Sequence, residues 1–275
     1  MMNRQLDLSL QERSMYKKPK TILILLAYNA HKTLRGFYKS LPLNLFDEII
    51  LFDDASRDKT YEISKSLGIK TYRNKVNLGY GGNLKKALSI SLLREAEIVV
   101  DIHPDNEYKP DAIKPALKLI NKGSDLVLGN RFYDLNYVFN KSGMFIWKII
   151  PLLTLNIISR LLLKTNISDL HQGFRVYTKK LLEKINFESN SNNYLFSFEL
   201  ICQAVFADAK ISEVPVNTNY LGKKRGAKLV SSINYSLGTF KIMLLFILAK
   251  LGIKTRIFKQ PRTKLFGRLS NILKE

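Results

Sequence analysis

Short apolar runs alternate with amphipathic segments through the first half of the chain. One such segment, 31–41, repeats Leu34, Phe37 and Leu41 at the spacing of one helix face. This alternation is typical of an α/β fold, in which helices cover both faces of a mostly parallel sheet. The runs that we expect to form its strands are 21–26, 48–52, 69–73, 98–102 and 125–128.

The pattern changes in the second half. Residues 144–163 are almost entirely apolar and predict one or two helices, with a break or kink at Pro151 because proline lacks the amide hydrogen that a helix interior uses. Residues 196–207 predict another helix with an apolar face. The run 210–216 is expected to be an edge strand, since its Pro215 cannot donate to a neighbouring strand.

Two stretches are apolar enough to raise the question of a membrane span. Lys148 and Arg160 interrupt the first, 144–163, and the second, 242–249, is far shorter than the roughly 20 residues that a helix needs to cross a bilayer. We therefore expect neither to span a membrane. Residues 1–19 mix both charge signs without an apolar core, which predicts a polar arm and not a secretory signal.

The chain is strongly basic. Its 44 Lys and Arg against 23 Asp and Glu give a formal net charge of +21, which indicates a polyanionic partner: nucleic acid, an anionic membrane surface or a phosphorylated substrate. The sequence has no helix-turn-helix signature, zinc-finger pattern or RNP motif, which disfavours nucleic acid. From residue 221 onward, thirteen basic residues accompany a single acid, Glu275, so we treat this tail as a separate region.

Cysteine use points to a reducing compartment. Cys202 is the only cysteine, which excludes an intrachain disulfide and a cysteine-rich zinc site. It lies on the apolar face of the predicted helix 196–207, so we expect it to fill the core.

Polar side chains follow the apolar run 98–102 directly. Such a break delivers them to the carboxyl edge of the sheet, where open α/β sheets bind ligands. Asp101, His103 and Asp105 are two residues apart, so they would share one face of an extended segment and could hold a cation that bridges phosphates. The alternative is a polar turn at the end of the strand.

Two further segments carry candidate chemistry. The glycine-rich run 77–83 precedes a predicted helix, and free amides at the start of a helix favour phosphate binding. No Walker or GxGxxG spacing is present, so a flexible turn without a ligand is an equally good interpretation. The segment 166–178 gathers Asp169, His171 and Arg175 beside a glycine, a composition that suggests a site.

Together these motifs resemble the family-two inverting glycosyltransferases of the GT-A fold, particularly the branch that includes polyprenyl-phosphate sugar synthases. The resemblance covers roughly residues 21–220 in the family's order and spacing. The segments that carry it are LLAYNA (25–30), ILFDDASRDKT (50–60), NLGYGGNLKKA (77–87), VVDIHPDNEYKPDAI (99–113), DLVLGNRF (125–132), SDLHQGFRVYTKKLLE (168–183) and FSFELICQAVFADAKISEVPV (196–216).

The resemblance implies a division of the chain and a set of donor-binding residues. Residues 20–135 would form the nucleotide-sugar-binding half of a GT-A domain and 136–220 the acceptor half, between the arm 1–19 and a basic, amphipathic, membrane-associating helical tail, 221–275. The residues implied in binding the base, ribose and phosphates of the donor are Ala27, Tyr28, Asp53, Asp54, Gly79, Gly82, Lys85 and Arg131.

The family's metal and acceptor motifs are also recognisable. Asp105 matches the second carboxylate of the family's DxD motif, with His103 in place of the first, which implies Mg²⁺ or Mn²⁺ bound by these two residues. Asp169 and Arg175 match the family's aspartate-x-x-x-glycine-x-arginine pattern, which implies that they act in catalysis on the acceptor, together with Asp105.

Three positions depart from the family's usual residues. Ala30 stands in place of a frequent glutamate, Glu107 in place of glutamine and Asn219 in place of arginine. The basic run 223–225 could supply the missing charge. These departures concern the identity of the substrates more than the fold.

The resulting expectation is a metal-dependent inverting glycosyltransferase. It would move a sugar from a nucleotide-diphosphate donor to a membrane lipid phosphate or a cell-envelope glycan precursor, as a peripheral protein on the cytoplasmic face of an anionic membrane, with a homo-oligomer possible. If the acceptor is a hydroxyl, Asp169 must take its proton; a lipid phosphate needs no strong base. The alternatives are a catalytically inactive membrane scaffold and, less favoured, a nucleic-acid-binding module.

Overall fold

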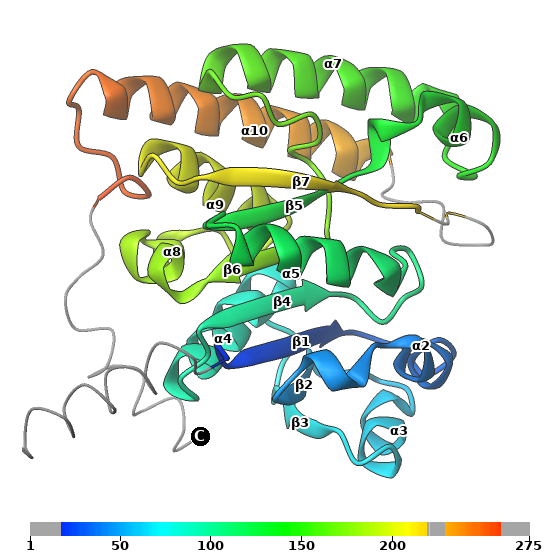
Figure 1. Cartoon of the computed structure of the whole chain (residues 1–275). Helices are drawn as coiled ribbons and strands as arrows, with labels where there is room; N and C mark the ends of the chain where they lie inside the picture. The colour runs from blue at the N-terminus through cyan, green and yellow to red at the C-terminus, as the bar shows by residue number, and fades with distance from the viewer. Residues whose placement is uncertain (1–17, 219, 221–228, 260–275) are drawn as a thin grey trace, which may run out of the picture.

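A seven-stranded sheet forms the centre of the protein. The computed structural model describes residues 18–218, 220 and 229–259 (Figure 1). The strands lie in the order β3-β2-β1-β4-β6-β5-β7, and all neighbours are parallel except β6, which is antiparallel to both β4 and β5. The strands are β1 (Thr21–Ala27), β2 (Glu48–Asp53), β3 (Lys70–Arg73), β4 (Ile98–Ile102), β5 (Leu126–Asn130), β6 (Arg175–Thr178) and β7 (Ile211–Pro215).

Helices cover both faces of this sheet, as the sequence predicts. Side chains of β1 alternate between the two faces, with Ile22 and Ile24 in one apolar core and Leu23 and Leu25 in the other. One face carries α2 (Leu34–Ser40), α3 (Thr60–Ser66) and α5 (Ile113–Asn121), and the other carries α4 (Gly79–Leu93), α8 (Lys179–Lys184) and α9 (Leu195–Phe206). Short 3-10 turns cover Leu43–Leu45, Pro110–Ala112, Arg131–Tyr133 and Phe187–Ser189.

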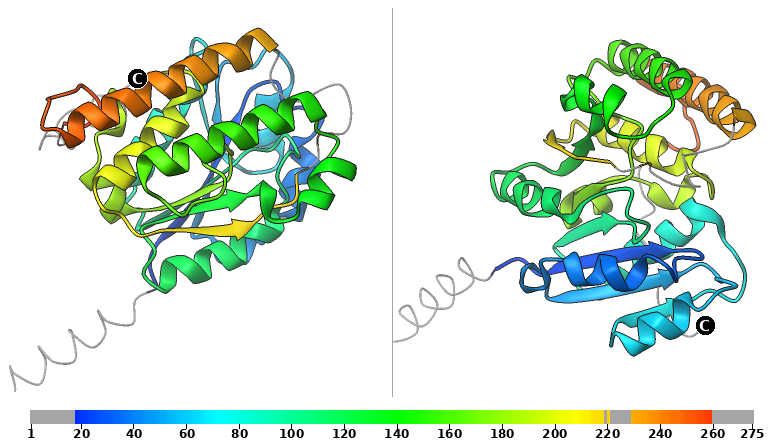
Figure 2. Two further views of the ribbon diagram at one scale, coloured as in Figure 1. Left: turned by 90° about the horizontal axis from the view of Figure 1, so that it is seen from above. Right: turned by 90° about the vertical axis from the view of Figure 1, so that its right-hand side faces the viewer.

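Two long helices form an outer layer beyond α9. Helix α6 (Leu135–Asn140) leads into α7 (Ile146–Leu163), and α7 runs beside α10 (Leu229–Lys250), as Figures 1 and 2 both show. Helix α10 also packs along α9. This outer layer places two apolar helices on one side of the domain.

Most predicted elements are present, with two corrections. Strand β6 was not predicted, because its four residues follow a polar, glycine-containing segment and its partners come from distant parts of the chain. Residues 146–163 form one helix, α7, which continues through Pro151, so the expected break into two helices is absent. Edge strand β7 is confirmed, since only β5 pairs with it, and Cys202 is buried in α9 as expected.

The second apolar stretch is part of a much longer helix than the run 242–249 indicated. Both Ile146–Leu163 and Val230–Lys250 are long and apolar enough to cross a membrane by length and composition alone, so the length argument against the second was wrong. Helix α10 begins at Leu229, well before residue 242, and its N-terminal part includes polar residues. One face of α10 nevertheless buries Ile242, Met243 and Phe246 in the core. The helix is thus packed on the α/β domain and is not a detached tail.

Candidate functional site

The carboxyl ends of parallel strands bring the predicted nucleoside residues together. Ala27 at the end of β1 is in register with Asp53 at the end of β2, and the Ala27 carbonyl accepts a hydrogen bond from the Asp54 amide at 2.9 Å. Tyr28 follows with its side chain half-exposed, 46% by residue. His103 follows β4, which pairs with the other side of β1. An aromatic ring and polar groups therefore gather at one sheet edge.

The two aspartates at this edge are buried and already paired. Asp53 accepts a hydrogen bond from the Ser56 amide at 3.0 Å, and its other oxygen lies 3.3 Å from Nε of Arg73. Asp54 accepts from the Asn74 amide group at 2.9 Å and from the Leu78 amide at 2.8 Å. The visible role of Asp54 is therefore to fix the loop that leads into α4.

The glycines at the start of α4 face a neighbouring loop. The amides of Gly81 and Gly82 donate to the carbonyl of Asn192, at 2.8 and 3.2 Å. A Cβ atom on Gly79 would lie 2.6 Å from that carbonyl oxygen, and one on Gly81 would lie 2.2 Å from the carbonyl oxygen of Ser191. The glycines therefore permit close packing of two loops, and these two amides are already satisfied without a phosphate.

Lys85 holds the same loop. Its ammonium group donates to the carbonyl of Asn190 and to Oδ1 of Asn192, the latter at 2.7 Å. Burial lowers the pKa of Lys85. From the other side, Glu199 of α9 accepts a hydrogen bond from the Ser191 hydroxyl at 2.8 Å. The loop is tied to both helices.

The candidate metal residues lie in the turn after β4 and do not continue the strand. Asp105 accepts a hydrogen bond from the Glu107 amide at 3.0 Å, and Asn106 has a φ of 63°, so this segment is a tight turn. Asp101 is fully buried inside the sheet. The expectation that all three share one extended face is therefore wrong for Asp105, which lies in the turn, while His103 and Asp101 do face each other. Among the described residues, no group of three His, Cys, Asp or Glu side chains could hold a metal ion.

His103 and Asp105 still fit a cation whose remaining ligands come from a substrate. Mg²⁺ is usually held by one or two protein carboxylates together with phosphate oxygens and water, and a partly exposed Asp105 suits that role. Nε2 of His103 is buried without a hydrogen-bond partner, 3.8 Å from Oδ1 of Asp101, which also has none. Burial raises the pKa of Asp101. Since Nε2 is buried and faces Asp101, Nδ1 is the ring nitrogen of His103 that could bind a cation.

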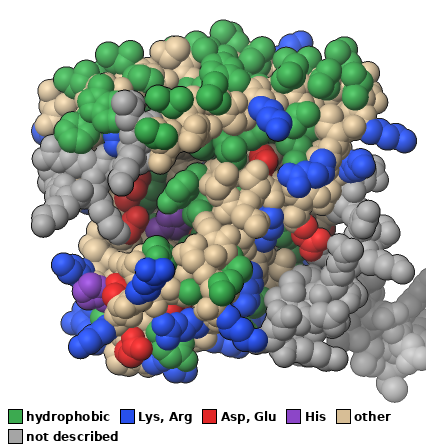
Figure 3. Space-filling model, turned by 180° about the vertical axis from the view of Figure 1, so that it is seen from behind, with side chains coloured by type: hydrophobic (Ala, Val, Ile, Leu, Met, Phe, Trp, Pro, Cys, Tyr) green, Lys and Arg blue, Asp and Glu red, His purple; other side chains and the backbone are tan. Residues whose placement is uncertain are grey.

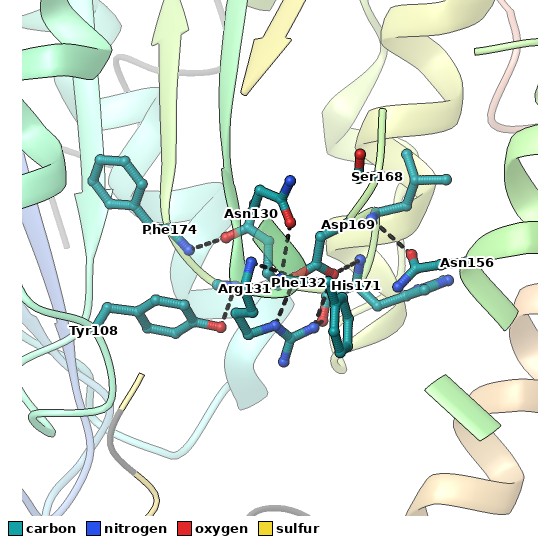
Figure 4. Close-up of polar contacts among 12 residues, drawn as sticks. Tyr108, Asn130, Arg131, Phe132, Asn156, Ser168, Asp169, His171 and Phe174 are labelled. Carbon is teal, nitrogen blue, oxygen red and sulfur yellow. Dashed lines mark hydrogen bonds and ion pairs between the residues drawn. The ribbon is translucent and has the colours of Figure 1, made fainter. Parts of the chain in front are cut away.

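Arg131 and Asp169 form a buried pair, shown in Figure 4. The guanidinium Nε lies 2.7 Å from Oδ2 of Asp169 and Nη2 lies 2.9 Å from Oδ1, and the Arg131 amide donates to Oδ2 at 3.2 Å. Burial opposes ionisation of Asp169, but the charge and hydrogen bonds of Arg131 prevail and lower its pKa. The two residues predicted to act on phosphate and acceptor thus bind each other.

The remaining hydrogen bonds of Arg131 connect three parts of the chain. Nη1 donates to the Tyr220 hydroxyl at 3.1 Å, which itself donates to Glu107 at 2.7 Å, and Nη2 donates to the His171 carbonyl at 2.7 Å. Burial raises the pKa of Glu107. Sequence reasoning noted Glu107 only as a departure and missed Tyr220, because nothing local to either residue shows this contact. Asn219 and residues 223–225 lie outside the described residues.

The hydrogen bonds of Arg175 go to residues other than Asp169. It is in register with Asp101 across β4 and β6, its Nη1 lies 3.1 Å from the Tyr80 hydroxyl, and Nη2 donates to the carbonyl of Gln172. The Tyr80 ring packs edge-on against His103, with centroids 5.5 Å apart. Tyr80, which sequence reasoning did not single out, therefore links Arg175 to the turn after β4.

Comparison with known proteins gives a consistent result. The sequence model described as glycosyl transferase family 2 matches residues 22–186. A UDP-N-acetylglucosamine–dolichyl-phosphate N-acetylglucosaminyltransferase of Methanococcus voltae is 27% identical over 84% of this chain and 96% of its own length. A polyprenol monophosphomannose synthase of Mycolicibacterium smegmatis is 26% identical over 76% of this chain and 77% of its own.

The fold also matches solved structures. The glucosyl-3-phosphoglycerate synthase of Mycobacterium tuberculosis, in a crystal structure with Mn²⁺, UDP and glucosyl-3-phosphoglycerate, superposes with a TM-score of 0.63 at 17% identity. The match covers 86% of this chain and 81% of that one. At this identity the likeness concerns the fold.

Proposed function

Because the chain belongs to glycosyl transferase family 2, we propose that it is a metal-dependent inverting enzyme that transfers a sugar from a nucleoside-diphosphate donor to a polyprenyl-type lipid phosphate. The chain is a glycosyltransferase, and relatives matched over most of both lengths carry dolichyl-phosphate and polyprenol in their names. The proposal of a lipid-phosphate acceptor rests on one observation: both carboxylate oxygens of Asp169 are bound by the guanidinium of Arg131.

Sugar transfer requires stabilisation of the negative charge on the departing nucleoside diphosphate. Attack by the acceptor on the anomeric carbon, opposite the leaving group, inverts that carbon in a single displacement. A divalent cation supplies charge stabilisation to the diphosphate when bound. Asp105 and His103 are the residues that would hold it. Tyr28 offers a half-exposed ring on which a base can stack.

The acceptor is better explained as a phosphate than as a hydroxyl. A hydroxyl acceptor requires a general base, and a carboxylate whose pKa is lowered by a bidentate arginine is a weak one. A lipid phosphate is already ionised and can attack without losing a proton. The pairing of Asp169 with Arg131 therefore favours a phosphate acceptor over a glycan hydroxyl. In this proposal, Asp169 and Arg131 hold the loop 168–173 in place and do not take a proton from the acceptor.

We propose that α7 and α10 dock this enzyme on the cytoplasmic face of an anionic membrane. Neither helix contains Asp or Glu, and Lys148, Lys241 and Lys250 lie along them. Hydrophobic side chains gather along the upper part of the molecule in Figure 3, and we call this the apolar band. The exposed large apolar side chains of α7 and α10 are Ile146, Trp147, Ile150, Ile157, Leu161, Leu162, Val230, Ile233, Leu237, Phe240, Leu244 and Ile247.

The helices are better suited to lying in the interface than to crossing it. Met243 and Phe246 are buried against the domain, while Phe240, Leu244 and Ile247 are exposed. A helix with one face in a protein core cannot also be surrounded by lipid. Cationic, acid-free helices with a single exposed apolar face are typical of interfacial anchoring.

A ligand-binding and turnover experiment tests the proposal. Nucleotide sugars should raise the thermal midpoint of the full chain more with Mn²⁺ or Mg²⁺ than without, because a ligand of the native state stabilises it. The substitution Asp105→Asn should abolish that metal-dependent increment and nearly abolish transfer to polyprenyl phosphate. Normal turnover of Asp105→Asn at saturating metal would rule the metal assignment out. No transfer by the unaltered chain with any donor would favour the inactive scaffold.

A further inference from the structure

His171 lies in the segment 168–173, the acceptor loop, where this loop meets three helices. Its Nδ1 is 2.9 Å from the hydroxyl of Tyr235 on α10, and its Nε2 is 3.4 Å from the hydroxyl of Ser159 on α7. Its ring stacks on Phe198 of α9, with centroids 4.9 Å apart and planes 24° apart. The side chain is thereby fixed on three sides, by α7 and α10 of the outer layer and by α9 beneath them.

The backbone of His171 binds both members of the buried pair. Its carbonyl accepts from Nη2 of Arg131 at 2.7 Å, and its amide donates to Oδ1 of Asp169 at 3.3 Å. Figure 4 shows these three residues in contact. A displacement of His171 therefore changes the geometry of the Arg131–Asp169 pair.

Helix α10 has one face toward this loop and one toward the outside. Tyr235 and Thr239 lie on the inner side, with Thr239 fully buried, while Leu237, Phe240 and Leu244 are exposed. The Tyr235 ring meets the His171 ring edge-on at 5.6 Å. A rigid helix that contacts a bilayer on its outer face transmits any change of its position to Tyr235.

We propose that His171 is a positioning residue that couples the docking of α7 and α10 on a bilayer to the geometry of the Arg131–Asp169 pair, so that transfer is fastest when the enzyme is on the membrane. This inference rests on the membrane docking proposed above. Burial lowers the pKa of His171 to about 3, so the ring is neutral at physiological pH and offers one N–H and one lone pair. The two hydroxyls can each donate or accept, so both contacts persist.

Hydrogen exchange and kinetics of Tyr235→Phe test the coupling. In the unaltered chain, phosphatidylglycerol vesicles should slow amide exchange in residues 168–173 and raise kcat. Tyr235→Phe should bind the vesicles equally well and keep its donor KM, but lose the slowed exchange and about tenfold in kcat, as expected for one lost hydrogen bond in the loop. Ser236→Ala is the matched control, since that hydroxyl donates within α10 to Ser232.

The variants at His171 separate positioning from packing. His171→Gln keeps a donor and an acceptor and should recover much of the kcat that His171→Phe loses. Unchanged exchange in 168–173 of the unaltered chain when it is on vesicles, or a Tyr235→Phe variant with full kcat and full vesicle stimulation, overturns the coupling. If the unaltered chain does not bind vesicles, the docking proposal fails and the coupling with it; lowered kcat of Tyr235→Phe in solution would then show a purely local role.

Discussion

At the scale of single residues, the pairing of Asp169 with Arg131 is the feature that bears most on the nature of the acceptor. Asp169 is fully buried and bound to Arg131 through two side-chain contacts. Removing one partner of a buried pair leaves the other charge uncompensated. We expect Asp169→Asn to lower the free energy of unfolding by about 3–5 kcal/mol, measured by urea denaturation.

The matched control removes both charges. Arg131→Met combined with Asp169→Leu should recover most of the lost stability, because no unpaired charge remains. A single Asp169→Asn variant as stable as the unaltered chain would contradict a structural pair and return Asp169 to the role of a free base.

His171 gives the molecule a predictable pH dependence of stability. Burial lowers its pKa from 6.5 to about 3, so below pH 6.5 the unfolded chain takes up a proton there that the folded chain does not. The stability that this residue contributes is therefore complete above pH 6.5 and falls as the pH falls toward 3. We expect the difference in unfolding free energy between the unaltered chain and His171→Gln to change by up to about 1.4 kcal/mol per pH unit between pH 6 and 4. Parallel pH profiles of the two proteins would refute this.

At the scale of elements, the start of α4 shows what its glycines do. A Cβ on Gly81 would lie 2.2 Å from a carbonyl oxygen of the neighbouring loop and 2.8 Å from Cβ of Phe196. We expect Gly81→Ala to destabilise the protein by about 1–3 kcal/mol through overpacking, measured by thermal or urea unfolding.

Gly36 in α2 provides the matched control. A Cβ there meets nothing within 4 Å, so Gly36→Ala should stabilise the protein by about 0.5–1 kcal/mol. Equal effects of the two substitutions would show that the contact between the α4 start and the 190–193 loop is looser than described.

The elements that sequence reasoning predicted are those encoded by local pattern. Buried strands such as β1 and β4 are continuous apolar runs, and the helices between them repeat at helical spacing. Strand β6 was missed because four residues between two distant partners carry little local signal. The extent of α10 was missed because its first half mixes serine, asparagine and glycine with apolar residues and is held by its packing on α7 and α9.

For the candidate site, the sequence indicated where its segments lie in the fold but not which side chains contact one another. The sheet edge, the loop before α4, the turn after β4 and the Asp169 loop all lie where the motifs indicated. The pairing of Arg131 with Asp169, and the contacts of Tyr80, Tyr220 and Tyr235, depend on residues far apart in the chain. Such contacts leave no signal in spacing or composition.

At the scale of the whole molecule, the net charge of +21 and the apolar band of α7 and α10 both support the proposed docking on an anionic membrane. We expect Leu244→Glu, which places an acid in the middle of that band, to release much of the protein from phosphatidylglycerol vesicles in a co-sedimentation assay. Val76→Glu changes an equally exposed apolar side chain outside the band and should leave binding intact. Release by both variants, or by neither, would argue against docking through these helices.

The central claim is that a lipid phosphate, and not a hydroxyl, accepts the sugar. The most direct measurement compares transfer from a labelled nucleotide sugar to polyprenyl phosphate with transfer to the corresponding polyprenol, at the same chain length, in vesicles with Mn²⁺ or Mg²⁺. The account predicts turnover with the phosphate and at most trace turnover with the alcohol, because Asp169 is bound to Arg131 and cannot act as an efficient base. Comparable transfer to the alcohol would contradict it.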